Sequence, residues 1–330
     1  MNDLTARILN RLSTGNAFLS GESLCNEFGI TRSAVWKHIG QLRAEGYQID
    51  AVTGRGYHLS GLTGRPVEAE VRPFLTARRF GIKFHYHTET ASTNLLAKAL
   101  AVEGAPEGSV VVADSQSGGR GRMGRLWVSP PGVNLYFSLI LRPDVPSIRV
   151  PQLTLLVAVA IHRALIALSS GLEPMIKWPN DILVNEKKLC GVLCEMQSEP
   201  EQTHFVVVGI GINVNQTGMP DELRESATSL FLEREQLFSR PELLALVLNH
   251  FEPLYDEWLL QDDLGFILPY LEKYALLQSR EVSIDQRNRN LRGTVTGIAC
   301  GGELKLECAD GQTVLVSSGE AHLHKKSDKT

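Results

Sequence analysis

Residues 118–127 read GGRGRMGRLW, and this stretch places four glycines and three arginines within ten positions. Glycine lets the backbone approach a ligand closely, because it has no side chain. The guanidinium group of arginine offers forked donors that match the oxygens of a phosphate or a carboxylate. The stretch, called the arginine loop below, therefore predicts a loop that holds a polyphosphate or an acyl phosphate.

The arginine loop also satisfies the dinucleotide-binding fingerprint, with glycines at positions 119, 121 and 124 after an expected strand. That fingerprint has to open a helix. Here Ser129-Pro130-Pro131-Gly132 follows, and its prolines prevent a helix. We therefore reject a nicotinamide or flavin site. A solvent-exposed basic loop is the simpler alternative, but it does not explain the glycines between the arginines or the neighbouring Trp127.

Three further motifs bring polar or flexible residues to expected element ends. Lys177-Trp178-Pro179-Asn180-Asp181 lies between two expected strands, where the lysine can neutralise charge on a reacting carboxylate or α-phosphate, although Pro-Asn-Asp is also ordinary turn chemistry. Ser92-Thr93-Asn94 precedes a helical pattern and either caps it or binds a polar ring. The stretch 209–215, GIGINVN, is a glycine-broken strand that either meets a ligand or packs in the core.

The first 66 residues predict three helices and a hairpin. Asp3, Ser20 and Thr31 can cap the helices, and Gly29 and Gly46 can end two of them. Strands are expected at 47–52 and 57–59 around the turn Thr53-Gly54-Arg55-Gly56. This order is that of a winged helix-turn-helix. Glycines and a proline at 61–66 then indicate a linker.

The rest of the chain divides into two parts. From 67 to 274, strands are expected at 82–87, 109–113, 134–141, 176–178, 189–195 and 204–209, and helices at 93–102, 150–168, 241–259 and 264–274. This alternation predicts a mixed α/β domain. From 275 to 330, apolar runs at 282–284, 291–298, 303–306 and 313–316 between glycine-containing turns predict a small β-barrel.

Composition sets the wider limits. The net charge is −4, but residues 1–66 carry seven Arg/Lys and five Asp/Glu, so this segment is +2 and the remainder is −6. This asymmetry is weak support for a polyanion partner of the first domain. No apolar run is long enough for a membrane span or a secretory signal, so we expect a cytoplasmic protein.

Metal-centred and covalent hydrolysis are not indicated. The five cysteines are scattered, and Cys190 and Cys194 on an expected strand lie about 13 Å apart, too far to share one metal ion. The nine histidines form no metal-binding motif, and no serine, histidine and acid stand at a recognisable nucleophile spacing. We therefore assign no metal ligands, and activation of a carboxylate by a nucleotide is better supported.

Taken in order, these motifs closely resemble the biotin protein ligases, with 191–195 (GVLCE) and 211–215 (GINVN) as further matches. The stretch 33–39 (SAVWKHI) and Gly54-Arg55-Gly56-Tyr57 resemble the bifunctional members that carry a repressor module. The resemblance implies a multidomain α+β fold: a winged helix-turn-helix at 1–66, a ligase domain similar to class II synthetases at 67–274, and an SH3-like β-barrel at 275–330. It also implies ATP and Mg²⁺ as cofactors.

The resemblance assigns roles residue by residue. The implied catalytic residues are Lys177, Arg122 and Arg120, and the implied biotin site is Ser92, Thr93, Asn94, Gln116, Arg120, Gly121, Arg122 and Lys177. The implied nucleotide contacts are Arg122, Trp127, Asn180 and Asn213, and the implied DNA contacts are Arg32, Ser33, Trp36, Lys37, Arg43 and Arg55. Met123 departs from the family pattern, which usually has arginine there, and this lowers the charge of the arginine loop.

The implied activity has two steps: biotin and ATP give biotinyl-5′-adenylate, and a lysine of the biotin carboxyl carrier protein of acetyl-CoA carboxylase then takes the biotin. The adenylate-bound homodimer is expected to bind operator DNA of biotin biosynthesis genes and repress them. Three alternatives stay open: a lipoate-type ligase, a biotin-sensing repressor without catalysis, and a ligase with an idle DNA module.

Overall fold

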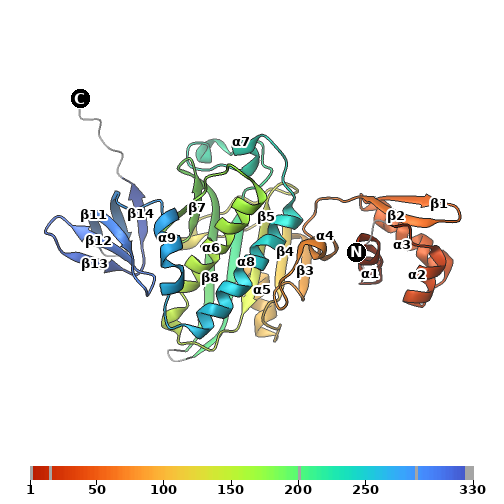
Figure 1. Ribbon diagram of the computed structural model, residues 1–330, viewed down its shortest axis with the longest axis horizontal. Helices are drawn as coiled ribbons and strands as arrows, with labels where there is room; N and C mark the ends of the chain where they lie inside the picture. The colour runs from red at the N-terminus through yellow and green to blue at the C-terminus, as the bar shows by residue number, and fades with distance from the viewer. Residues whose placement is uncertain (1–2, 15–16, 200–201, 287–288, 324–330) are drawn as a thin grey trace.

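The computed structural model describes residues 3–14, 17–199, 202–286 and 289–323, which form three parts in a row (Figure 1). The N-terminal part contains α1 (Asp3–Ser13), α2 (Gly21–Phe28), α3 (Arg32–Ala44), β1 (Gln48–Val52) and β2 (Gly56–Gly61). The Ser20 side chain caps α2, the Thr31 side chain caps α3, and Gly29 ends α2 in the left-handed conformation. The expected three helices and hairpin are confirmed.

The core of this part comes from one apolar face of each helix. Ile8, Leu24, Val35 and Ile39 are almost fully buried. Strands β1 and β2 pair antiparallel and form the wing. The short helix α4 (Glu68–Val71) follows the linker, and the loop after it includes the turn η1 (Arg72–Phe74).

The central part is a seven-stranded sheet in the order β3-β4-β5-β9-β8-β7-β6. The strands are β3 (Phe84–Thr90), β4 (Val110–Gln116), β5 (Leu135–Leu141), β6 (Met175–Lys177), β7 (Asp181–Val184), β8 (Lys187–Ser198) and β9 (Thr203–Ile212). Among the described strands of this sheet, only β3 and β4 pair in parallel. Strands β6 to β9 follow one another through short connections, so these neighbours pair antiparallel. The sequence missed β7, whose four residues follow the polar turn directly.

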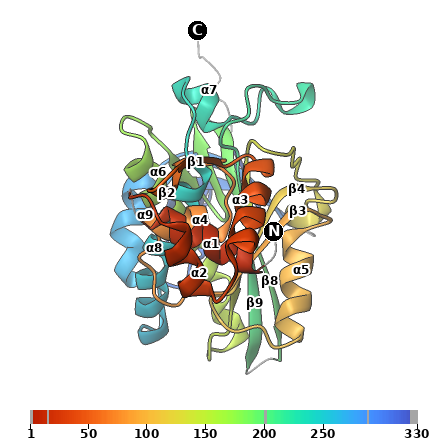
Figure 2. The same ribbon diagram turned by 90° about the vertical axis from the view of Figure 1, so that its right-hand side faces the viewer.

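Helices cover both faces of this sheet. The helices are α5 (Thr93–Val102), α6 (Gln152–Leu168), α7 (Leu230–Arg234), α8 (Arg240–Leu260) and α9 (Leu268–Tyr274), and the single turns are η2 (Arg122–Gly124), η3 (Ser147–Arg149), η4 (Asp221–Leu223) and η5 (Gly265–Ile267). Figure 2 shows α6 and α8 on one side and α5 on the other. Strand residues alternate accordingly: Leu139 faces α6 and α8, whereas Ile140 faces α5.

The expectation that no segment is long and apolar enough to cross a membrane is wrong by length and composition. Among the described residues one helix, Ser147–Leu168, meets both criteria, with a mean hydropathy of 1.7. In the fold, 72% of its apolar window is buried. Helix α6 therefore packs as a core helix against the sheet and beside α8.

The C-terminal part is an antiparallel sheet in the order β13-β12-β11-β10-β14. Its strands are β10 (Glu281–Gln286), β11 (Arg289–Ile298), β12 (Leu304–Cys308), β13 (Thr313–Val316) and β14 (Glu320–Leu323), and only β14 was not predicted. Its core residues Val282 and Leu306 belong to the same hydrophobic cluster as the central part. The indole N–H of Trp178 also donates to the carbonyl of Gly302 at 3.0 Å, so this part is docked firmly on the central one.

His162 on α6 is fully buried and ties two other segments together. Its Nε2 donates to the Pro174 carbonyl at 2.7 Å, which fixes the proton on Nε2, and its Nδ1 accepts from the Tyr270 hydroxyl at 2.8 Å. Burial lowers the pKa of His162 to about 4, with a smaller effect from Arg163. Pro174 immediately precedes β6, so this neutral imidazole supports the strand that carries Lys177.

The pH dependence of stability tests this assignment. Between pH 6.5 and about 4, His162 takes up a proton in the unfolded chain but not in the folded one, so stability falls as the pH is lowered through this window. The loss attributable to His162 is about 3 kcal/mol at most. We expect His162→Gln, which keeps a donor and an acceptor but does not titrate, to flatten the slope of denaturant-unfolding free energy against pH. An unchanged slope would contradict the assignment.

Candidate functional site

A cavity of about 520 Å³ opens where the central sheet, the arginine loop and β14 meet. It gathers residues from four of the sequence motifs. The predicted biotin and nucleotide residues Ser92, Thr93, Asn94, Gln116, Arg120, Gly121, Arg122, Trp127, Lys177, Asn180 and Asn213 all line it. The structure therefore brings together side chains from distant parts of the chain: Ser92 and Asn213 are 121 positions apart (213 − 92).

One end of the cavity is a network of polar groups at the start of α5, in which the Glu195 carboxylate is the one charged member named below. The Gln116 side-chain oxygen accepts from the Thr93 backbone N–H at 2.8 Å, and the Ser138 hydroxyl donates to the Asn94 side-chain oxygen at 2.6 Å. The Asn94 amide donates to the Glu195 carboxylate at 2.7 Å. These bonds fix donors and acceptors in one orientation, which suits recognition of a polar ring.

Sequence reasoning assigned no role to Ser138, or to Glu195 beyond its place in the 191–195 match, although both hold the predicted residues in place. Both lie within strands, β5 and β8, whose local pattern is that of ordinary sheet residues. Ser92 occupies the cap position of α5, but its side chain makes no capping hydrogen bond. The helix-capping alternative therefore does not account for the Ser92 hydroxyl.

The floor of the cavity is made of glycines on β8 and β9. A Cβ atom at Gly209 would lie 2.0 Å from the Asn94 Oδ1, and one at Gly211 would lie 2.5 Å from the Trp127 indole. At Gly191 the corresponding distance to the Trp127 ring is 3.0 Å. These positions lack side chains because Asn94 and Trp127 lie directly against the backbone. Packing of the protein's own side chains therefore accounts for the glycines of this strand.

The arginine loop forms a narrow hairpin rather than a helix. The Gly121 N–H donates to the Arg125 carbonyl at 2.8 Å, and the Trp127 N–H donates to the Gly119 carbonyl at 2.9 Å. Met123 at the tip has φ of 56° and is largely exposed. The chain continues without a helix into β5, so the rejection of a dinucleotide fingerprint is confirmed.

The arginines of the loop point to different partners. Arg122 donates to the Asn180 side-chain oxygen at 3.0 Å, and Asn180 in turn donates to the Val192 carbonyl. Arg125 forms a forked ion pair with Glu320 of β14, with one contact at 2.7 Å. The ion pair with Arg125 lowers the pKa of Glu320, with smaller effects from His322 and Lys177, so this carboxylate stays ionised. The sequence analysis missed Glu320, because nothing local to β14 indicates a partner nearly 200 residues away.

Lys177 ends β6, and the turn that follows contains a cis peptide bond between Trp178 and Pro179. Its neighbour Asp181 pairs with Lys188 at 2.8 Å, and the Lys188 ammonium lies 5.5 Å from the centre of the Trp127 ring. The nearby carboxylate is thus engaged by Lys188, and Lys177 lines the cavity. A cation placed there can stabilise negative charge on a reacting carboxylate or phosphate.

The remaining titratable groups near the cavity do not form a metal cluster. Within the described ranges no three His, Cys, Asp or Glu side chains gather as they would around a metal ion. Cys194 on β8 is half-buried, and desolvation raises its pKa to about 11. A thiol of this kind is unreactive at neutral pH.

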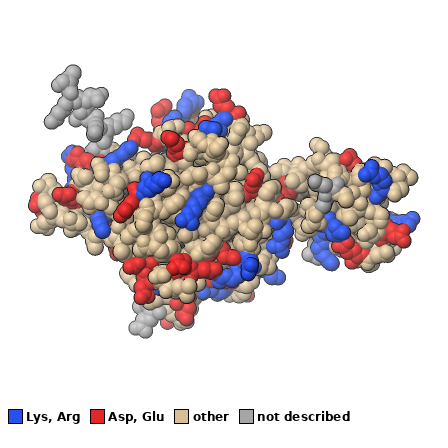
Figure 3. Space-filling model, viewed as in Figure 1, with Lys and Arg blue, Asp and Glu red and all other residues tan. Residues whose placement is uncertain are grey.

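The predicted DNA-contacting residues lie on the outer face of the N-terminal part. Arg32, Ser33, Trp36 and Lys37 are exposed on α3, whereas Val35 and Ile39 face inward, and Trp36 is 70% exposed. Arg55 at the tip of the wing lies 4.2 Å from the Phe18 ring centre. Figure 3 shows basic side chains on this part interspersed with acidic ones.

Arg43 differs from the other predicted DNA contacts. Its guanidinium donates to the Ile49 carbonyl, with its Nε at 2.9 Å, and so ties α3 to β1. The structure therefore gives Arg43 an intradomain role, and its role toward DNA stays a prediction.

Comparisons with known proteins match all three parts. The biotin/lipoate A/B protein ligase family matches residues 84–213, an HTH domain matches 5–58, and the biotin protein ligase C-terminal domain matches 280–323. The chain is 43% identical over 305 residues to the bifunctional ligase/repressor BirA of Bacillus subtilis, covering 90% of this chain and 91% of the relative. It is 28% identical to the protein of the same name from Escherichia coli, covering 93% of both.

Among solved structures, the fold is similar to that of the biotin protein ligase from Aquifex aeolicus in complex with biotin and ATP. The TM-score is 0.65 at 28% identity, and the match covers 74% of this chain and all of that one.

The glycine floor generates a first test of the site. Gly209→Ala should displace Asn94, because its new Cβ would collide with the amide oxygen. With biotin as the probe that the sequence resemblance predicts, affinity should fall by about tenfold or more, as expected for a lost buried hydrogen bond. Gly218→Ala is the control, since nothing lies within 4 Å of a Cβ there. Equal affinities by calorimetry would remove the assigned role of Asn94.

The ion pair between Arg125 and Glu320 generates a second test. Glu320→Gln keeps the shape of the side chain but removes its charge, so tryptic cleavage within the arginine loop should become about two- to fivefold faster, the effect of an exposed ion pair. Glu281→Gln removes a similar exposed pair with Arg292, away from the loop, and should not alter this cleavage. Equal cleavage in both variants would show that β14 does not restrain the loop.

Proposed function

Because this chain belongs to the bifunctional ligase/repressor family of biotin protein ligases, we propose that it attaches biotin to an acceptor protein and represses transcription in response to biotin. The single observation that carries the ligase role is the cavity, in which a polar network, a glycine floor and the cationic side chains of Lys177, Arg120 and Arg122 converge. The 43% identity across nearly the whole chain supports both roles.

In the first proposed step, a biotin carboxylate oxygen attacks the α-phosphorus of ATP, and pyrophosphate leaves with the electron pair of the broken P–O bond. The product is biotinyl-5′-adenylate, a mixed anhydride. Lys177, Arg120 and Arg122 contribute positive charge where the carboxylate and the α-phosphate meet, which lowers the repulsion between the two anions. Thr93, Asn94 and Gln116 hold the ring of biotin at the other end.

In the second proposed step, the neutral amine of an acceptor lysine attacks the carbonyl carbon of the adenylate. The new amide bond forms, the amine loses a proton and AMP leaves. The acceptor is the biotin carboxyl carrier protein of acetyl-CoA carboxylase. The arginine loop lies over the cavity, so its closure keeps water from the anhydride until the acceptor arrives.

The nucleotide occupies the end of the cavity near Trp127, Asn180 and Asn213. The indole of Trp127 offers an aromatic surface, and its buried N–H has no hydrogen-bond partner among the described residues. Asn213 donates one amide N–H to the Thr228 carbonyl at 2.9 Å, so its side-chain oxygen and second N–H remain for a ligand. Asn180 acts through Arg122, whose guanidinium it orients.

Magnesium is proposed as the cofactor that accompanies ATP. Asp181, Glu186, Glu225 and Glu320 supply carboxylate oxygens around the cavity, the donor type that Mg²⁺ prefers. Asp181, Glu186 and Glu320 are already paired with cations, so the ion would be held largely by the phosphates of the nucleotide. Bound Mg²⁺ would supply charge neutralisation at those phosphates.

The repressor role uses the exposed face of α3 and the wing. Arg32, Lys37 and Arg55 would contact phosphates, while Ser33 and Trp36 lie where α3 would meet base edges. A net charge of +2 on one such domain gives weak affinity, so we propose that adenylate-bound homodimers bind two operator half-sites of biotin biosynthesis genes. Both roles belong in the cytoplasm, where ATP and the operator are found.

The alternatives differ in what they require of the chain. A lipoate-type ligase has no need for the winged helix-turn-helix that matches residues 5–58. A repressor without catalysis has no need for Lys177 beside Arg120 and Arg122 in the cavity. A ligase with an idle DNA module has the same cavity, so only DNA binding distinguishes it.

Lys177→Ala tests the catalytic assignment. Because the ammonium group stabilises charge that develops during adenylation, the rate of adenylate formation should fall about 100-fold or more, while biotin affinity should change far less. Pyrophosphate release in a single-turnover experiment measures the rate, and calorimetry measures the affinity. Near-normal pyrophosphate release would remove Lys177 from the chemistry.

The experiment that tests the whole proposal follows two signals in the same samples. The protein is incubated with ATP, Mg²⁺, the carboxyl carrier protein and the promoter of the biotin operon, with and without biotin. Acceptor labelling together with a biotin-dependent electrophoretic shift is the expected result. Labelling without a shift indicates an idle DNA module, and a shift without labelling indicates a repressor that has lost its enzyme.

A further inference from the structure

The segment between the two domains, residues 62–66, is held in place by a buried carboxylate. Glu70 on α4 is only 1% exposed. One of its oxygens accepts from the Thr63 backbone N–H at 3.1 Å and from the Thr63 hydroxyl, and the other accepts from the Gly64 N–H at 2.9 Å. Hydrogen bonds to an ionised group are among the stronger ones. The expected linker is therefore a fixed part of the structure.

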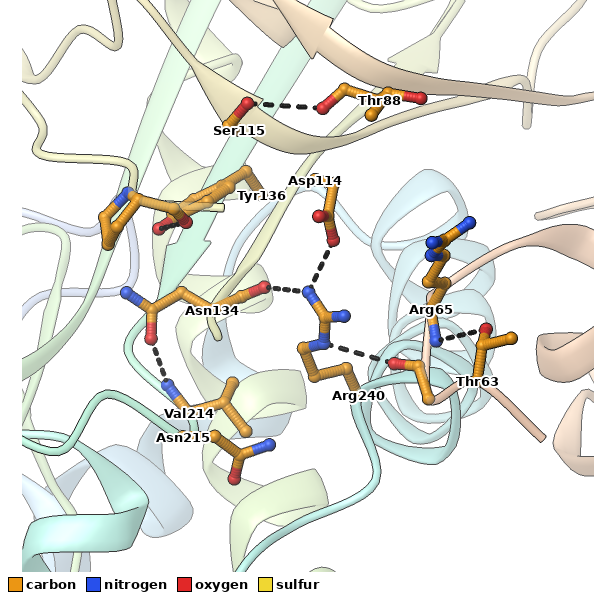
Figure 4. A network of polar contacts seen from close by, with 12 residues as sticks. Thr63, Arg65, Thr88, Asp114, Ser115, Asn134, Tyr136, Val214, Asn215 and Arg240 are labelled. Atoms are coloured by element: carbon orange, nitrogen blue, oxygen red, sulfur yellow. Dashed lines mark hydrogen bonds and ion pairs between the residues drawn. The ribbon is translucent and has the colours of Figure 1, made fainter. Parts of the chain in front are cut away.

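Arg240, the first residue of α8, holds the same segment from the other side. Its side chain is 5% exposed. As Figure 4 shows, its guanidinium lies between the linker and the central sheet. Nε donates to the Gly64 carbonyl at 3.2 Å, and Nη1 donates to the Asp114 carboxylate at 2.8 Å and to the Asn134 carbonyl at 3.1 Å. We call Glu70, Thr63, Gly64, Arg240 and Asp114 the linker clamp.

The partners of Arg240 in the sheet stand next to the cavity. Asp114 is two residues before Gln116 on β4, so the two side chains share one face of the strand. The Asn134 side chain accepts from the Val214 N–H at 2.9 Å and donates to the Gln216 side-chain oxygen at 2.7 Å. Gln116, Gln216 and Asn213, the residue before Val214, all line the cavity.

We propose that the linker clamp couples occupancy of the cavity to the placement of the winged helix-turn-helix domain, with Arg240 as the positioning residue. This inference rests on the proposed function and adds a regulatory route within it. A ligand that shifts Gln116 or Gln216 also shifts Asp114 or Asn134, and the buried guanidinium passes this displacement to Gly64. Such coupling is reciprocal, so operator DNA changes the affinity for the cavity ligand by the same factor.

Arg240→Lys is the informative variant. Lysine keeps the positive charge beside Asp114, so the protein should still fold. Its single ammonium cannot span the fork that joins Gly64 to both Asp114 and Asn134. Arg234→Lys is the matched control, because Arg234 also donates to two carbonyls, those of Gly171 and Ser170, but lies away from the linker.

The experiment is backbone hydrogen exchange on the full-length protein with and without biotin, ATP and Mg²⁺. In the wild type and in Arg234→Lys, ligand should change the exchange rates of the Thr63, Gly64 and Arg65 amides severalfold. In Arg240→Lys most of that change should be lost, while biotin affinity and the melting temperature show that the site and the fold persist.

Each result bears on a defined claim. A full ligand effect in Arg240→Lys, or no ligand effect in a wild type that labels its acceptor, would overturn the clamp but leave the ligase role intact. Failure of the wild type to bind biotin or to label the acceptor would overturn the proposed function, and the clamp with it.

Discussion

The cavity depends on a close approach between side chains and the backbone of the central sheet. A Cβ atom at Gly209 would lie 2.0 Å from the Asn94 side-chain oxygen, and a Cβ atom at Gly211 would lie 2.5 Å from the Trp127 indole. Bulkier residues at these positions would lift both side chains away from the floor of the cavity. The Ser138 hydroxyl can reach Asn94 only in this arrangement, and Trp127 in turn anchors the end of the arginine loop.

Several cationic side chains line the cavity, and polar or acidic side chains of the protein hold three of them in place. Asn180 orients Arg122, Glu320 pairs with Arg125 and Asp181 pairs with Lys188. The lowered pKa of Glu320 reflects chiefly its ion pair with Arg125. An anionic ligand therefore enters a site whose cations are already held in position, which reduces the reorganisation needed when charge develops. The C-terminal part contributes Glu320 and so helps to form the site.

Sequence reasoning predicted the three-part organisation and the residues of the cavity because the motifs are local: glycines beside arginines, and polar residues at strand ends. It did not predict the roles of Ser138, Glu195 and Glu320, which depend on partners from distant strands. It treated residues 61–66 as a linker because glycine and proline were visible, whereas the buried Glu70 and Arg240 that fix them were not recognisable from spacing. It also placed Arg43 toward DNA, although the Ile49 carbonyl accepts from its guanidinium.

The central claim is that one cavity holds both reactants with their reacting ends between Lys177 and Arg122. A crystal structure of the full-length protein with biotin and a non-reactive ATP analogue tests it most directly. The account predicts the ring of biotin against Thr93 and Asn94, the adenine near Trp127, and the carboxylate facing the α-phosphate beside Lys177. Either ligand bound outside this cavity, or the two bound with their reacting groups far apart, would contradict it.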